Sequence, residues 1–303
     1  MSDAAVWGRW TADVLLRVEA GLDRWVPAEA PARLGEAMRY GVLDGGKRLR
    51  ALLVQAAAEA VGACHTEAGA EAALRAACAV ELIHAYSLVH DDMPCMDNDV
   101  LRRGKPTVHV RFGQAQAMLA GDAMQALAFE LLTPMDDAEL APALQARLVA
   151  VLSRGAGHSG MAGGQAIDLA SVGQQLQEAQ LRRMHELKTG ALLQASVDMG
   201  ALCGTAGAAT RAALSRYGHA IGLAFQVVDD ILDVTQDTQV LGKTAGKDQE
   251  QFKPTYVSLM GLQAAQEHAH ELHEQALAAL ADSALPDTQR LRELADLVVH
   301  RQH

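Results

Sequence analysis

Aromatic residues are scarce in this chain, and runs of β-branched residues are few. Phe, Trp and Tyr together make up 4% of the 303 residues. Strands are built largely from β-branched and aromatic side chains, so this scarcity argues against a large sheet. Half of the residues are apolar, and many of them are alanine, the strongest helix former. The sequence therefore predicts an all-α fold.

Positive charge is also in short supply. The chain has 26 Lys and Arg against 37 Asp and Glu, which gives a formal net charge of −11. Nucleic-acid binding depends on neutralising phosphates, so no nucleic-acid partner is expected. A small anion can still bind where the cations are concentrated locally.

Long apolar runs and patterned cysteines are missing as well. No uninterrupted apolar stretch reaches the roughly 18–20 residues that a membrane span needs. The first residues lack the basic start and apolar core of a signal peptide. The four cysteines are scattered without the spacing of a metal site, which favours reduced thiols in a cytosol. We expect a soluble, cytoplasmic protein.

The chain reads as a single helical domain over residues 1–303. Its length would allow two domains, but no linker, low-complexity tract or fixed-period repeat divides it. Loops are expected at 97–106 and 235–253, and a last short helix after Pro286. About ten helices are predicted in all, the others at 6–26, 32–43, 49–61, 67–93, 113–132, 138–157, 175–202, 208–234 and 254–281.

Two aspartate clusters stand in these apolar, alanine-rich helices. The first is Asp91, Asp92 and Asp97, and the second spans 229–233. Crowded carboxylates repel one another and resist desolvation, so they need a cation to stay ionised. Oxygen ligands suit Mg²⁺, which binds a few carboxylates together with waters and substrate phosphates.

The spacing within the two clusters differs. Asp229 and Asp233 are four residues apart, so they share a helix face, and Asp230 lies beside it. Six residues of regular helix turn through roughly 240°, which would point Asp97 away from Asp91. Pro94 resolves this conflict, because a helix that breaks there lets Asp97 fold back on a loop.

Basic groups accompany the carboxylates. Arg102, Arg103 and Lys105 follow the first cluster, and arginine offers a planar fork to phosphate oxygens. Lys47 and Arg50 lie a turn apart at a helix start, where backbone N–H groups favour an anion. Further cations are Lys188, beside Thr189 in an apolar helix, and Lys243 and Lys247 on a loop. Gly-Lys-Thr at 242–244 is not a P-loop, because Asp237 stands where the first glycine is needed.

Taken together, these elements resemble the trans-isoprenyl diphosphate synthases (polyprenyl synthetases), most closely the bacterial-type farnesyl diphosphate synthases. The likeness runs nearly end to end, and the number and order of the motifs argue against coincidence. The matching segments are Gly45-Gly46-Lys47-Arg48-Leu49-Arg50, His84 to Asp92, Leu101-Arg102-Arg103-Gly104-Lys105-Pro106-Thr107, Gly163-Gly164-Gln165-Ala166-Ile167-Asp168, Lys188-Thr189-Gly190, Phe225 to Asp233, and Gly242-Lys243.

The resemblance implies an all-α fold around a central cavity, with the two aspartate motifs facing each other across its mouth, and a homodimer. It implies that three Mg²⁺ ions bridge an allylic diphosphate and that no protein base is needed. The resemblance implies that Mg²⁺ is held by Asp91, Asp92, Asp97 and Asp229, with support from Asp230 and Asp233. It implies that the allylic diphosphate is neutralised by Arg102, Lys188 and Lys243, and that isopentenyl diphosphate is bound by Lys47, Arg50, His84 and Arg103. It also implies that the developing carbocation faces Thr189 and Gln226.

Product length is expected to depend on Tyr86. This side chain lies about one helical turn before Asp91, where a growing prenyl chain would extend. The resemblance associates an aromatic residue at this position with C15 products and small residues with longer ones. We therefore expect an enzyme, a prenyltransferase that makes farnesyl diphosphate from isopentenyl, dimethylallyl and geranyl diphosphates.

Other functions remain open at this point. A geranylgeranyl or geranyl diphosphate synthase would share all of these motifs. A class I terpene cyclase would keep the first aspartate motif, but it would replace the second and lack the 45–50 segment. A non-catalytic prenyltransferase subunit would have lost an aspartate motif, and this chain has both.

Overall fold

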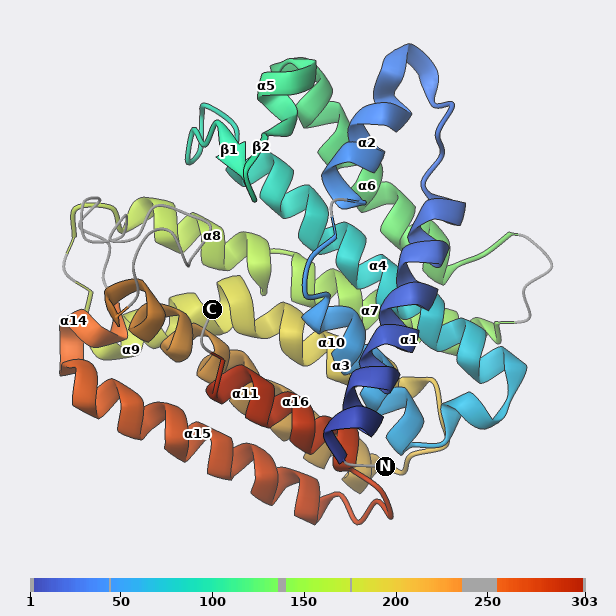
Figure 1. Cartoon of the computed structure of the whole chain (residues 1–303), viewed down its shortest axis with the longest axis vertical. Helices are drawn as coiled ribbons and strands as arrows, with labels where there is room; N and C mark the ends of the chain where they lie inside the picture. The colour runs from blue at the N-terminus through green and yellow to red at the C-terminus, as the bar shows by residue number, and fades with distance from the viewer. Residues whose placement is uncertain (1–2, 44, 136–139, 175, 236–254, 302–303) are drawn as a thin grey trace.

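The computed structural model describes residues 3–43, 45–135, 140–174, 176–235 and 255–301, which are almost entirely helical (Figure 1). The only strands among them are β1 (Leu101–Arg102) and β2 (Lys105–Pro106), an antiparallel pair in a tight hairpin. The all-α prediction is confirmed. The helical elements are α1 (Asp3–Trp25), η1 (Pro31–Arg33), α2 (Leu34–Val42), α3 (Leu49–Ala60), η2 (Ala63–His65), α4 (Glu67–Asp91), α5 (Val108–Phe112), α6 (Gln114–Leu132), α7 (Pro142–Ala156), α8 (Met161–Ala170), α9 (Glu178–His185), the π-helical turn η3 (Glu186–Gly190), α10 (Ala191–Leu202), α11 (Ala208–Thr235), α14 (Tyr256–Met260), α15 (Leu262–Asp282) and α16 (Gln289–Val299).

The core forms around α4, α10 and α11. Helix α4 packs on α3, α6 and α10, while α11 packs on α10 and α15. The buried apolar side chains of the described residues form one cluster, in which alanine is frequent. Small side chains let helix axes approach closely, which is how an alanine-rich chain fills its interior.

Helix α4 is a long apolar helix of the core, with 25 residues. Its start is capped by Thr66, whose hydroxyl accepts a hydrogen bond from the Gly69 N–H at 3.1 Å. Among the described residues it is the one helix long and apolar enough to cross a membrane. In the structure, 78% of its most apolar stretch is buried by the rest of the protein. The helix carries the first aspartate cluster at its C-terminal end.

Helix α8 was not predicted, because glycines in the segment 160–164 are typical of a break. In the structure, Cβ atoms on Gly160 and Gly163 would meet the carbonyl oxygens of Gly155 and His158 at 2.2 and 2.0 Å. A Cβ on Gly164 would lie 2.0 Å from the backbone nitrogen of Lys188, so α8 packs directly on the backbone of η3. The predicted helix over 175–202 is divided by the π-helical turn, and Gly261, with φ of 83°, separates α14 from α15. The loop predicted at 235–253 lies almost entirely outside the described residues.

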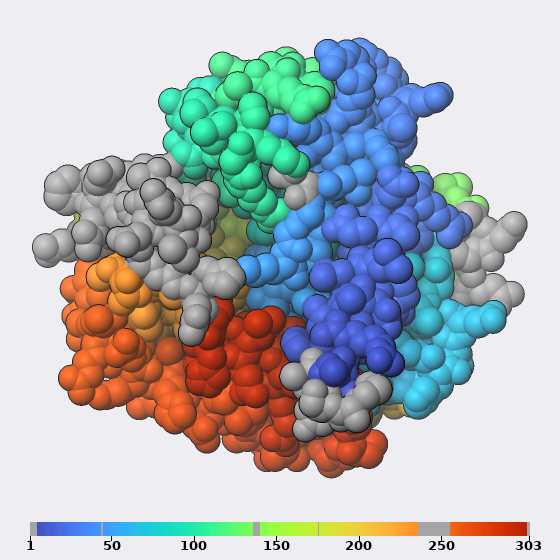
Figure 2. Space-filling view, in the orientation of Figure 1, coloured from blue at the N-terminus to red at the C-terminus, as the bar shows by residue number. Residues whose placement is uncertain are grey.

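The C-terminal helices cover α11 on one face of the molecule. The Tyr217 hydroxyl of α11 donates a hydrogen bond of 2.6 Å to the carbonyl of Leu291 in α16, which ties the two helices together. Both chain ends are visible on this face in Figure 1. In Figure 2, α15 and α16 form a continuous orange and red surface next to the dark blue of α1.

Candidate active site

The first aspartate cluster lies where α4 ends. The Asp97 N–H donates a hydrogen bond to the carbonyl of Asp91 at 2.8 Å, and Asn98 does the same to Met93 at 3.1 Å. The chain thus turns back on itself after the helix, as the proline at position 94 predicted. Asp91 and Asp97 are half-buried on one side of this turn.

Burial and charge crowding act together on Asp91. Burial raises the pKa of its carboxyl to about 6; Asp97 and Asp92 add to this, and Lys188 and Arg102 oppose it. A bound cation would oppose this rise in pKa, because it favours the ionised carboxylate. The donors are all oxygen, which fits Mg²⁺.

Asp92 is oriented differently from its neighbour. Its side chain is 3% exposed and receives a forked pair of hydrogen bonds from Arg102, with Nη2 at 2.7 Å and Nε at 3.0 Å. Arg102 reaches it from β1, and the hairpin is held to α2 by a hydrogen bond of 2.7 Å from the Tyr40 hydroxyl to the Pro106 carbonyl. Two side chains predicted to bind Mg²⁺ and diphosphate therefore bind each other.

The π-helical turn η3 links the two aspartate clusters. Lys188 forms an ion pair with Asp168 of α8 and is also attracted by Asp91 and Asp97. Burial by itself lowers the pKa of Lys188, but these carboxylates raise it overall, so the amine stays charged. The next residue, Thr189, donates a hydrogen bond of 3.1 Å to the Gln226 side chain on α11. π-Helical turns inside α-helices occur frequently at functional sites.

Close backbone contact places this turn. A Cβ on Gly222 of α11 would lie 2.7 Å from the Cα of Gly190, so α11 and η3 cross at a pair of glycines. Together with the Gly164 contact, this holds the backbone around Lys188 from both sides. The location of Lys188 and Thr189 between the two clusters follows from these crossings.

The second cluster contains one partly exposed and two buried carboxylates. Asp229 has a side chain that is 38% exposed and lies 3.4 Å from the Arg301 guanidinium. Asp230 is buried and accepts hydrogen bonds from the Gln226 amide at 2.9 Å and the Tyr256 N–H at 2.8 Å. Asp233 is also buried, at 8% exposure. The three carboxylates of this cluster therefore differ in their exposure to solvent.

The 45–50 segment brings cations toward the same region. Burial lowers the pKa of Lys47, and Arg301 adds to this while Asp229 opposes it, which locates this amine near the second cluster. Arg50 is half-buried, and its buried Nε has no hydrogen-bond partner among the described residues. An orphaned guanidinium nitrogen is a donor that an anionic ligand can satisfy.

Arg48 has a different role from its neighbours. It is 8% exposed and pairs with Glu19 at 2.8 Å and Glu81 at 3.3 Å, while its Nη2 donates to the Val42 carbonyl at 2.6 Å. Glu81 also accepts from the Ala51 N–H at 3.1 Å, so the network fixes the start of α3. This buried ion pair orients the segment that carries Lys47 and Arg50.

A pocket between α2, α4 and the β1–β2 hairpin contains two more of the predicted site residues. His84 and Arg103 line it, with Tyr40 and Lys105 at its other sides. Burial lowers the pKa of His84 well below its usual value, and nearby arginines, Arg50 first among them, lower it further. His84 is therefore a neutral hydrogen-bonding group at neutral pH. Arg103 donates to the Gly45 carbonyl at 2.5 Å, which joins the hairpin to the 45–50 segment.

Tyr86 lies on α4 ahead of the first cluster. Its side chain is buried among the helices and packs edge-on against the His90 ring, with centroids 5.7 Å apart. Burial raises the pKa of its hydroxyl, while a hydrogen bond with Gln125 of α6 opposes this. The ring thus lies between α4 and α6, about one helical turn before Asp91 on α4.

Three residues with a place in the site were not predicted. Arg301 follows α16 and stacks over Phe225 at 3.9 Å from the ring centroid. Asp168 holds Lys188, and Glu81 holds Arg48. Asp168 belongs to a segment whose resemblance was recognised, whereas nothing in the sequence around Arg301 marks it. Lys243, which was predicted, lies outside the described residues.

Comparison with known proteins gives a consistent result. Residues 31–293 match the polyprenyl synthetase family. The chain is 47% identical over 270 residues to a farnesyl diphosphate synthase of Escherichia coli, with 88% of each chain covered. It is also 47% identical over 277 residues to geranylgeranyl pyrophosphate synthase 11 of Arabidopsis thaliana, covering 89% of this chain and 76% of that one.

A solved structure supports the same conclusion. The geranyltransferase of Helicobacter pylori, complexed with magnesium and isoprenyl diphosphate, superimposes with a TM-score of 0.82 at 35% identity, covering 96% of this chain and 95% of that one. With the fold, both aspartate clusters and a family match over most of its length, the chain belongs to the polyprenyl synthetase family.

Proposed function

We propose that this chain is a prenyltransferase that condenses isopentenyl diphosphate head to tail (1'-4) with dimethylallyl and then geranyl diphosphate, giving farnesyl diphosphate. The observation that carries the proposal is the π-helical turn, which sets Lys188 and Thr189 between two carboxylate clusters. The named relatives, which include a farnesyl diphosphate synthase, support it. We further propose that residues 1–303 act as one domain, in keeping with the single buried cluster.

The partly exposed carboxylates Asp91, Asp97 and Asp229 would hold Mg²⁺ directly. Asp92, Asp230 and Asp233 are buried and would support them, either as ligands after a side-chain movement or through water. Three ions are proposed, as the resemblance implies. Bound Mg²⁺ neutralises diphosphate and so makes it a better leaving group.

The cations divide into two sets. Arg102 and Lys188 lie beside the first cluster and would neutralise the allylic diphosphate, together with Lys243. Lys47 and Arg50, with the neutral His84 and with Arg103, would bind isopentenyl diphosphate. In the reaction, the bond between the allylic C1 and the diphosphate oxygen breaks. The isopentenyl double bond attacks C1 through its C4, and a proton is lost to the departing diphosphate.

Thr189 and Gln226 would face the developing positive charge. The Gln226 Oε1 accepts from Thr189, and its Nε2 donates to Asp230, so the amide is held at both ends. Oxygen dipoles fixed in this way stabilise positive charge without having to reorient during the reaction. The apolar side chains of the buried helices exclude water, which would otherwise quench the cation.

The product is proposed to be C15 because the buried ring of Tyr86, about one helical turn before Asp91, would limit the length of a growing prenyl chain. The C20 product is the alternative, and the similarity to a plant geranylgeranyl pyrophosphate synthase supports it. Incubation with Mg²⁺, isopentenyl diphosphate and either primer, followed by chromatography of the dephosphorylated products, separates the two. Failure to condense either primer contradicts the synthase proposal, and a main product of C20 contradicts only the role of Tyr86.

A homodimer in the cytoplasm is proposed as the working form. Helix α6 leaves an apolar face uncovered, with Met118 and Leu119 exposed at 42% and 53%, and Val110 of α5 lies nearby at 49%. A second copy of the chain would cover it. Light scattering after gel filtration measures the mass. A monomer at micromolar concentration would contradict the proposal, and a Leu119→Glu variant should shift a dimer toward monomer.

A further inference from the structure

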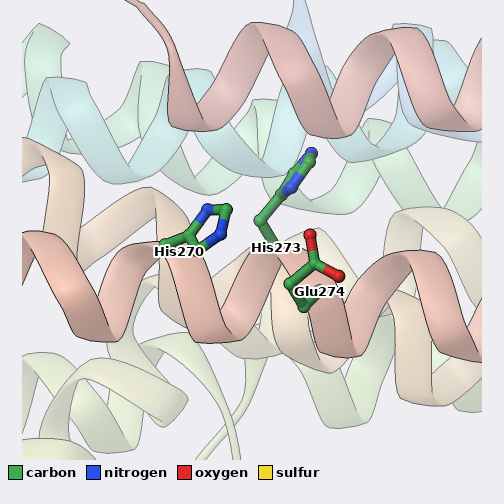
Figure 3. A group of neighbouring side chains, drawn as sticks. All are labelled: His270, His273 and Glu274. Atoms are coloured by element: carbon green, nitrogen blue, oxygen red, sulfur yellow. The ribbon is translucent and has the colours of Figure 1, made fainter.

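A group of metal-ligating side chains lies on the C-terminal helices, apart from the aspartate clusters. His270, His273 and Glu274 project from neighbouring turns of α15, and each offers a ligand atom within 4.8 Å of those of the others (Figure 3). They are spaced i, i+3 and i+4, which puts them on one face of the helix. In Figure 3, His270 and Glu274 lie on either side of His273.

His273 is the central residue of this group. It is 7% exposed, although both flanking side chains are exposed. Its Nε2 lies 2.7 Å from a carboxylate oxygen of Asp296 on α16. Its Nδ1 is buried and has no hydrogen-bond partner among the described residues. Buried polar atoms nearly always have a partner, so this nitrogen requires an explanation.

The Asp296 contact decides what the free nitrogen can do. A carboxylate accepts hydrogen bonds, so the Nε2 of His273 carries the proton. In the neutral ring the Nδ1 then presents a lone pair, which is the form of imidazole that binds a metal. Metal-binding histidines commonly donate their second N–H to a carboxylate in this way, which fixes the ring and increases its basicity.

We propose that His270, the Nδ1 of His273 and Glu274 bind one Zn²⁺ ion, with Asp296 orienting His273. Two imidazoles and a carboxylate are a ligand set that Zn²⁺ accepts, with a fourth position left for water. Zinc–ligand bonds of about 2.0–2.2 Å require the ligand atoms to move together slightly from their present separation. His270 and Glu274 are exposed and can make that adjustment by changing rotamer, while the buried His273 stays in place.

The chemistry separates this site from the aspartate clusters. Mg²⁺ prefers oxygen ligands and keeps its waters, so it favours the carboxylates of the catalytic region. Imidazole nitrogen favours zinc and its transition-metal neighbours. The stacked contact between the His270 and His273 rings, with centroids 6.4 Å apart, accounts for their packing but leaves the Nδ1 without a partner.

A second ligand set shares His273. Asp296 and His300 also lie with it within 4.8 Å, and the His300 ring is 5.7 Å from that of His273. In that arrangement Asp296 would exchange its hydrogen bond to His273 for a bond to the metal, and the Nδ1 would remain unpaired. The first set satisfies every polar atom of His273, so the geometry favours it.

Calorimetric titration with zinc chloride tests the site, using the full chain in excess Mg²⁺ to occupy the aspartate clusters. A Cys95→Ser background removes the exposed thiol as a competing ligand. We expect one zinc ion per chain, bound more than about 100-fold more weakly after His270→Ala or Glu274→Gln. Asp296→Asn should weaken binding by about 10–100-fold, the usual effect of losing an orienting carboxylate. His65→Ala is the matched control, because His65 is an exposed histidine far from α15 in the sequence. This variant should bind zinc as the wild type does.

The outcomes separate the arrangements. If His300→Ala abolishes binding while Glu274→Gln leaves it intact, the ion lies between α15 and α16 and the proposed ligand set is wrong. Equal zinc binding by wild type, His270→Ala and Glu274→Gln overturns the site altogether. As a second measurement, zinc should raise the Tm of the wild type in Mg²⁺ and leave that of His270→Ala unchanged.

Discussion

Substitution of the adjacent residues Asp229 and Asp230 should affect different properties. Loss of Asp230 should lower the free energy of unfolding, whereas loss of Asp229 should lower turnover with little change in stability. Asp230 accepts two hydrogen bonds in a buried position, one of them from the Tyr256 N–H at the first residue of α14. Asp230→Ala removes both acceptors. A buried donor left without a partner costs about 1–3 kcal/mol, and the half-buried Gln226 amide somewhat less, so we expect a loss of about 2–4 kcal/mol in the free energy of unfolding.

Asp229→Ala is the matched comparison. Its side chain is 38% exposed and approaches Arg301 at 3.4 Å, so its removal should change stability by no more than about 0.5 kcal/mol. Turnover should nevertheless fall by orders of magnitude, because Asp229 is a proposed direct ligand of Mg²⁺. Asp230→Asn should be milder than Asp230→Ala, since an amide oxygen still accepts from Tyr256 and Gln226 can rotate its own amide to match.

Urea unfolding followed by circular dichroism, at one fixed protein concentration, measures these differences. Initial rates of product formation with saturating Mg²⁺ measure the loss of turnover in Asp229→Ala. If Asp230→Ala unfolds at the same urea concentration as the wild type, its hydrogen bonds do not carry the stability we assign to them. Equal destabilisation by Asp229→Ala would show that exposure does not separate the two residues.

Three further predictions concern Tyr86, Gly164 and Asp198. Tyr86→Ala should lengthen the product beyond C15 because it removes the ring between α4 and α6, whereas Tyr86→Phe should keep C15; chromatography of the products distinguishes them, and an unchanged length after Tyr86→Ala would place the limit elsewhere. Gly164→Ala should reduce turnover at least tenfold, since its Cβ would lie 2.0 Å from the backbone nitrogen of Lys188 and displace η3. Gly8→Ala is the control and should leave turnover unchanged, because no atom lies within 4 Å of its Cβ position. Wild-type rates for Gly164→Ala would refute the close contact. Burial raises the pKa of Asp198 to about 6, above its unfolded value, so the folded state loses stability as pH rises from about 4 to 6 and does not regain it. Asp198→Asn should therefore match the wild type below pH 4 and exceed it above pH 6 by up to about 3 kcal/mol in urea unfolding; a gain that is the same at all pH values would contradict this cause.

Much of the fold was predictable because its signals are local. Alanine content and the proline at position 94 are sufficient to predict the helices and the return of Asp97 toward Asp91. Helix α8 was missed because its glycines are required by backbone contacts: Gly163 packs on the carbonyl of His158, and Gly164 packs on the backbone of η3, which follows later in the chain. Helix propensity gives no information about such a contact.

The site was predictable as a set of residue types, but their individual positions were not. Asp229 and Asp230 are neighbours in sequence, and only the fold shows that Tyr256, 26 residues later, binds one of them. Arg301 approaches Asp229 from 72 residues away with no motif around it. Lys243 remains a prediction, because it lies outside the described residues.

Under the proposed function, the pairing of Arg102 with Asp92 would make metal binding and anion binding interdependent. A cation that takes Asp92 frees the guanidinium for phosphate, and a phosphate that takes Arg102 frees the carboxylate for the cation. Each ligand should therefore increase the affinity of the other, and by thermodynamic necessity the two increases are the same factor. If the two side chains have these proposed roles, the pair would make binding cooperative, so that the allylic diphosphate and its metal would be held tightly only when both are present.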